Sequence, residues 1–67
     1  MAHNLESEML THFKLAISSA RDKDWYTAGK QYGFAYSAMC RLDSASSFSR
    51  AFNLALAIDN AFEILRK

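Results

Sequence analysis

Few side chains in this 67-residue sequence have the chemistry of a catalytic or metal site. The two histidines, His3 and His12, are nine residues apart, and neither has a carboxylate or thiol at ligand spacing. Because a zinc site needs three or four converging donors, the sequence predicts no metal centre. Cys40 is the single cysteine and falls near the end of an expected helix. Reactive thiols are favoured instead by helix N-termini, so we expect Cys40 to be a small buried residue.

The carboxylates of Asp59 and Glu63 share one helix face at a spacing of four residues. Two acids held in a pocket can perform acid–base catalysis. However, Arg66 and Lys67 follow Glu63 at three and four residues, which is the spacing of salt bridges on a solvated helix surface. We therefore interpret this pair as part of an exposed charged face, and the sequence predicts neither an enzyme nor a bound cofactor.

Size and composition indicate one small domain over residues 1–67. Such a chain buries only about 60% of its unfolded surface. With one cysteine it has no internal disulfide, so helix packing or self-association must supply stability. The net charge of +1 gives no strong field for nucleic acid or anionic membranes. The longest apolar run, 54–58, is too short to span a bilayer, and the N-terminus lacks the basic region of a signal peptide. We expect a cytoplasmic protein with no membrane partner.

Apolar residues recur at helical spacing in three segments. We expect an all-α, three-helix, up-down-up bundle over residues 5–21, 25–42 and 47–66, joined by short connections. Asn4 is the expected N-cap of the first helix, Asp24 or Asp22 of the second, and Ser46 or Ser47 of the third.

The third segment is apolar around most of its circumference. Beside its main stripe of Phe48, Phe52, Ala55, Ile58, Phe62 and Leu65 lies a second set, formed by Leu54, Ala57, Ala61 and Ile64. An ordinary surface helix has one stripe. We therefore expect this helix either to be central in the bundle or to pack on a second copy or a partner.

The second segment contains both glycines of the chain, Gly29 and Gly33, in one row that Ser37 continues. Each glycine costs a helix about 0.8–1 kcal/mol relative to Ala. We expect these missing side chains to let helix three, or another chain, approach closely. Phe34 and Tyr36 lie off the main stripe of this helix. Either they form an interaction surface, since exposed aromatic residues are enriched at hot spots, or the first and third helices pack on both sides of the second and cover them.

Around the first expected turn, a leucine and a small residue, Leu15 and Ala16, precede the spaced set Ala28, Tyr32 and Ala35. In these residues the chain resembles a tetratricopeptide-type helical hairpin. The microtubule-interacting-and-transport domain is similar at the same residues. The match covers about half the chain, and His12, Ser19 and Cys40 stand where the repeat has Trp, Tyr and Pro. In size and style the chain also looks like the accessory proteins of bacteriophage early regions, including those of lambdoid phages.

The hairpin resemblance implies a protein-interaction scaffold. We therefore expect a non-catalytic helical regulatory protein that binds a partner protein, acts as a homodimer, and belongs among phage accessory or host-modulating factors. The expected interface is Gly29, Gly33, Ser37, Phe34 and Tyr36 on the second helix, or Leu54, Ala57, Ala61 and Ile64 on the third. The alternative is a dimeric nucleic-acid-associated regulator whose basic residues are assembled by the dimer.

Overall fold

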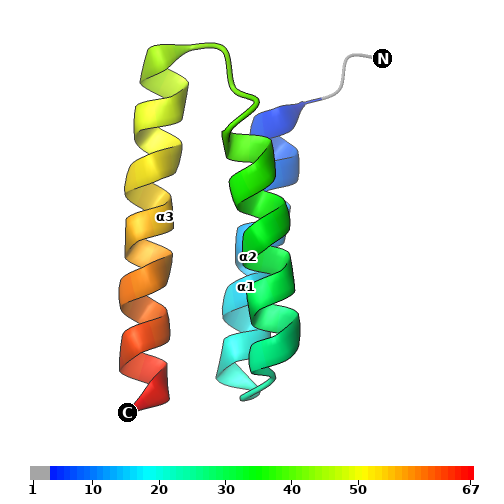
Figure 1. Cartoon of the computed structure of the whole chain (residues 1–67), viewed down its shortest axis with the longest axis vertical. Helices are drawn as coiled ribbons and strands as arrows, with labels where there is room; N and C mark the ends of the chain where they lie inside the picture. The colour runs from blue at the N-terminus through cyan, green and yellow to red at the C-terminus, as the bar shows by residue number, and fades with distance from the viewer. Residues whose placement is uncertain (1–3) are drawn as a thin grey trace.

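The computed structural model describes residues 4–67 and contains three helices, α1 (Leu5–Arg21), α2 (Trp25–Met39) and α3 (Ala45–Arg66). α1 and α2 form an antiparallel hairpin, and α3 runs back alongside that pair (Figure 1). This arrangement confirms the all-α, three-helix fold with up-down-up order.

Each helix begins at a side chain that accepts a hydrogen bond from an otherwise unpaired backbone N–H, as N-caps do. Asn4 Oδ1 accepts from the N–H of Ser7 at 3.2 Å, and Asp24 Oδ1 accepts from the N–H of Thr27 at 3.2 Å. Both caps were predicted from the sequence. α3 begins two residues earlier than predicted, because its cap is Ser44, whose Oγ accepts from the Ser47 N–H at 3.3 Å.

α2 ends at Met39, three residues before the predicted end. After the Cys40 N–H bonds to the Tyr36 carbonyl, the next two N–H groups bond to carbonyls only three residues back: Arg41 to Ala38 and Leu42 to Met39. Such i to i−3 bonds tighten the last turn of a helix and end it. As a result Arg41 lies beyond the helix.

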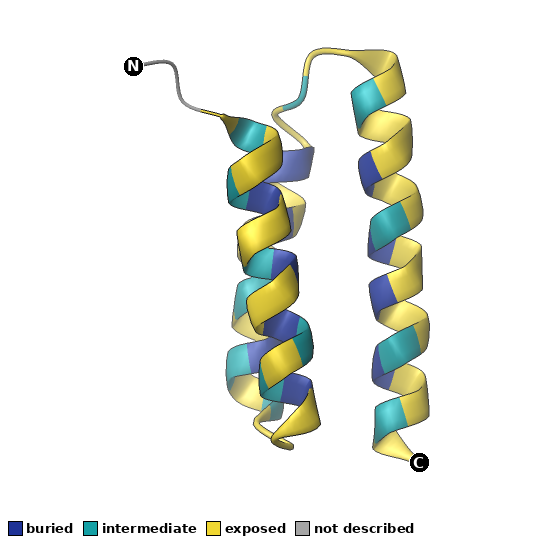
Figure 2. Cartoon of the chain, turned by 180° about the vertical axis from the view of Figure 1, so that it is seen from behind, coloured by how far each residue is buried: buried dark blue, intermediate teal, exposed yellow. Residues whose placement is uncertain are grey.

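The core is built largely from small side chains. Seven of its twelve buried residues are alanines, and the largest fully buried side chains are Phe13 and Met39. α1 and α2 both bury alanines, and α1 and α2 are the most closely packed pair of helices. Burial lies along one side of each helix, with exposed residues on the other (Figure 2).

α3 is the least packed of the three helices. It makes fewer contacts with α1 and α2 than those two make with each other. The molecule measures 37 × 23 × 12 Å, so it is a flat body in which α3 stands beside the α1–α2 pair (Figure 1). The expectation that α3 could be the central helix is therefore wrong, although it is the most apolar around its circumference.

Candidate functional site

An open groove follows the line where α1 meets α3. Its larger part is a hollow of about 380 Å³ whose apolar lining comprises Leu10, Phe13, Ile17, Leu54 and Ile58. A second hollow of about 250 Å³ shares Leu10 and Leu54 with the first and continues it toward Glu6 and Arg50. We refer to the two hollows together as the α1–α3 groove.

The spacing along α1 places one row of residues on the rim of this groove. Leu10, Lys14, Ile17 and Arg21 follow one another at intervals of four, three and four residues, which is the repeat of a single helix face. Leu10 stays 42% exposed although it is a large apolar residue. On the opposite wall, Leu54 and Ile58 are one turn apart on α3. The groove is therefore an apolar trough with two cations on its α1 side.

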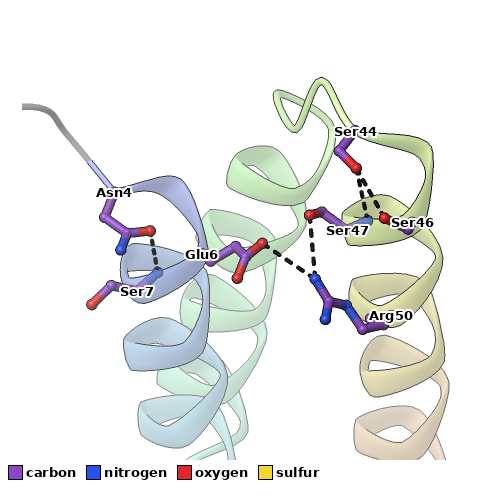
Figure 3. Close-up of polar contacts among 7 residues, drawn as sticks. All are labelled: Asn4, Glu6, Ser7, Ser44, Ser46, Ser47 and Arg50. Atoms are coloured by element: carbon purple, nitrogen blue, oxygen red, sulfur yellow. Dashed lines mark hydrogen bonds and ion pairs between the residues drawn. The ribbon is translucent and has the colours of Figure 1, made fainter.

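Charge in the groove is uneven along its length. At one end, Arg50 on α3 reaches Glu6 on α1 at 3.8 Å and Ser47 Oγ at 3.5 Å, as Figure 3 shows. At the other end, Lys14 and Arg21 have no ion-pair partner within residues 4–67. Glu6 is the one carboxylate that lines either hollow, and Arg50 already pairs with it. The groove thus carries positive charge that this part of the chain does not neutralise.

A second surface lies where α2 faces α3. Phe48 and Phe52 stack in parallel with ring centres 6.3 Å apart, yet they are 39% and 37% exposed. On α2, Tyr36 stacks on Tyr32 at 6.0 Å and is itself exposed. We call the exposed rings of Tyr36, Phe48 and Phe52, with the neighbouring glycine row of α2, the aromatic face.

The glycine row itself is open. Apart from the adjoining residues and backbone of α2 itself, no described atom lies within 4 Å of a Cβ added at Gly29 or Gly33, and both residues are exposed, as is Ser37. The expectation that α3 of the same chain packs into this row is therefore wrong, because α3 meets α2 along the neighbouring row that contains Trp25 and Tyr32. Packing against another chain stays a prediction.

The other predicted interface residues fall on two different surfaces. Phe34 is exposed on the α1 side of α2, where its ring lies 5.4 Å from the ring of His12. On α3, Leu54 is partly buried in the groove, whereas Ala57 is exposed, Ala61 is intermediate, and Ile64 is 71% exposed. Leu54 is the member of this set that lines the α1–α3 groove.

Sequence reasoning missed the groove residues of α1. Leu10 and Ile17 alternate with Lys14 and Arg21 at helix-face spacing, and that alternation could have shown that both cations stand beside apolar side chains.

The side chains that could act in catalysis or bind a metal are far apart or already have hydrogen-bond or ion-pair partners. His12 Nδ1 lies 2.6 Å from Gln31 Oε1, while His3 lies outside the described residues. Cys40 is exposed, which corrects the expectation of burial, because α2 ends before it. Glu63 pairs with Arg66 at 3.7 Å, as expected for a solvated face. Within residues 4–67, no three His, Cys, Asp or Glu side chains converge as metal ligands.

Over the part of the chain that the structure describes, no helix is both long and apolar enough to cross a membrane. No protein-family model, curated protein or solved structure matches the chain. The resemblances to helical hairpin repeats and to phage accessory proteins accordingly stay predictions.

Proposed function

We propose that this protein is non-catalytic and acts by binding other proteins, with a homodimer as its working form. The observation that carries the proposal is the exposure of large apolar side chains on α3. Four of them, Phe48, Phe52, Leu56 and Ile64, are between 37% and 71% exposed on a helix of 22 residues. Clustered apolar surface on a small soluble domain marks an interaction site more often than a solvated one.

The aromatic face is the surface that best suits a second copy. Its residues are uncharged, so a face-to-face contact between copies brings no like charges together. A two-fold dimer places the same patch against itself, and Phe48 and Phe52 of one copy could lie over the open row of Gly29 and Gly33 in the other. The missing Cβ atoms there leave room for a ring. This arrangement would also explain why α2 tolerates two glycines.

Light scattering over a dilution series tests this proposal. We expect the mass of a dimer at high protein concentration and dissociation toward the monomer on dilution. Phe52→Glu should shift the equilibrium to monomer, because it buries a charge in the contact. The matched control is Asn53→Glu, which adds the same charge at an exposed residue of the same helix that is not part of the aromatic face. A wild-type protein that stays monomeric at the highest concentration would contradict the homodimer.

A further inference from the structure

We propose that the α1–α3 groove binds one amphipathic helix of a partner protein, through an apolar stripe flanked by two carboxylates seven residues apart. This inference rests on the proposed function of binding proteins, but it uses a surface separate from the aromatic face. The partner's carboxylates pair with Lys14 and Arg21, and its apolar stripe lies on Leu10, Ile17 and Leu54.

The length of the groove suits a helix. Its lining on α1 extends from Glu6 to Arg21, and at 1.5 Å per residue this corresponds to about 22 Å. A partner helix of about 15 residues fills that length with four turns. Amphipathic helices that lie in grooves use anchors at i, i+3 or i+4, and i+7. The groove's own spacing of Leu10, Lys14, Ile17 and Arg21 repeats with the same period.

Charge complementarity identifies the partner helix as acidic. Lys14 and Arg21 are both exposed, and they lie seven residues, or two turns, apart on the same rim. Acids seven residues apart on a partner helix match that separation of about 10 Å, whichever way the helix runs. Neither cation has an ion-pair partner within residues 4–67, so pairing with a partner sacrifices no existing salt bridge among them.

The same charges disfavour a second copy of this chain as the occupant. A face-to-face contact through the groove would bring Lys14 and Arg21 of one copy toward those of the other, and like charges in a contact reduce affinity. A membrane surface is also disfavoured, because the apolar floor residues Phe13 and Ile58 are buried. Helices that bind membrane interfaces instead insert a projecting apolar face.

Selection from a displayed library of helical peptides about 16 residues long tests the proposal with the full-length protein as bait. We expect enriched peptides to carry an apolar stripe and two acidic positions seven residues apart. Titration of a synthetic enriched peptide into ¹⁵N-labelled protein should shift the amide signals of Leu10, Ile17 and Leu54 most strongly. Lys14→Glu and Arg21→Glu should each weaken binding about tenfold. The double variant Lys14→Glu/Arg21→Glu should bind a peptide that has Lys in place of both acids.

The matched control is Arg41→Glu, which makes the same charge change in the α2–α3 connection and should alter affinity by about twofold or less. The proposal is overturned if no peptides are enriched, if enriched peptides lack the two acids, or if Lys14→Glu binds them as well as the wild type. It is also overturned if the protein sediments with phosphatidylcholine–phosphatidylglycerol vesicles and Leu54→Glu abolishes that binding. Light scattering on the same samples separates the two ideas, since a persisting dimer without peptide binding contradicts only the groove inference.

Discussion

The phenol of Tyr32 on α2 donates a hydrogen bond to Asp59 Oδ2 on α3, at an oxygen–oxygen distance of 3.2 Å. The Tyr32 ring also packs against Phe13 of α1 and Phe62 of α3, with centres 5.6 and 5.8 Å away. One side chain thus contacts both of the other helices. Because α3 makes fewer contacts than the other two helices, the hydrogen bond and ring contact of Tyr32 are among those that join it to the α1–α2 pair.

The ionisation of Tyr32 should make stability depend on alkaline pH. Burial of the phenol, and then the negative charge of Asp59, raise the pKa of Tyr32 to about 12 from the ordinary 10.0. The folded state therefore favours the protonated phenol, whose stabilising contribution is complete below pH 10 and is lost as the pH rises from 10 to about 12. Urea unfolding followed by circular dichroism at several alkaline pH values should show this decline.

Tyr32→Phe keeps the ring but removes both the hydrogen bond and the titrating proton. We expect it to lower the free energy of unfolding by about 0.5–1.5 kcal/mol at neutral pH and to lose less stability than the wild type between pH 10 and 12. Tyr26→Phe is the control, because Tyr26 is 79% exposed. Equal alkaline losses in the wild type and Tyr32→Phe would contradict the assignment.

Substitution of the glycine row should affect folding and association in opposite directions. Gly33→Ala adds a methyl group where no described atom outside the adjoining part of α2 lies within 4 Å. We expect it to stabilise the monomer by about 0.8–1 kcal/mol through helix propensity alone. If an aromatic ring of a second copy packs on the glycine row, the same methyl group should weaken dimerisation, which light scattering measures. A variant that is more stable and dimerises normally would remove the row from the interface.

Ala35→Leu provides the contrast on the same helix. Ala35 is fully buried in the core, and extra methylene groups in a packed core destabilise by about 1–3 kcal/mol. A gain of stability in Gly33→Ala with a loss in Ala35→Leu, both measured by thermal unfolding, would establish which face of α2 points inward.

Acidic pH should weaken the start of α2. Asp24 accepts side-chain and backbone hydrogen bonds from Thr27, and these lower the pKa of Asp24 below the ordinary 3.8. The cap's contribution is therefore present above pH 3.8 and is lost as the pH falls through the lower folded value. Asp24→Asn, which caps without titrating, should remove this part of the acid dependence of the melting temperature, whereas Asp22→Asn should not.

Local signals predicted much of the fold. The caps at Asn4 and Asp24 and the 3.6-residue periodicity of the apolar side chains were sufficient to place three helices and their order. The start of α3 was harder to predict, because Ser44, Ser46 and Ser47 are all good caps and only tertiary placement selects among them. The end of α2 has neither Gly nor Pro to mark it, so it was placed three residues too late.

The candidate site depended on how the helices pack, which periodicity alone does not determine. The row of Gly29 and Gly33 is one step around the helix from the row that faces α3, so a rotation of α2 by a fraction of a turn decides whether the glycines are covered. Similarly, Lys14 and Leu54 lie 40 residues apart in the sequence, and only the position of α3 beside α1 brings them to one groove.

The single tryptophan, Trp25, stands at the first turn of α2, where α3 passes by. Its ring meets Phe62 edge-on at 5.8 Å and lies 5.1 Å beneath the Arg66 guanidinium. Both partners belong to the last turns of α3, the helix with the fewest contacts. Detachment of α3 would expose the indole to water and remove a cation from its face, while the α1–α2 hairpin could remain folded. The protein therefore contains an intrinsic fluorophore that reports the docking of its third helix without any label.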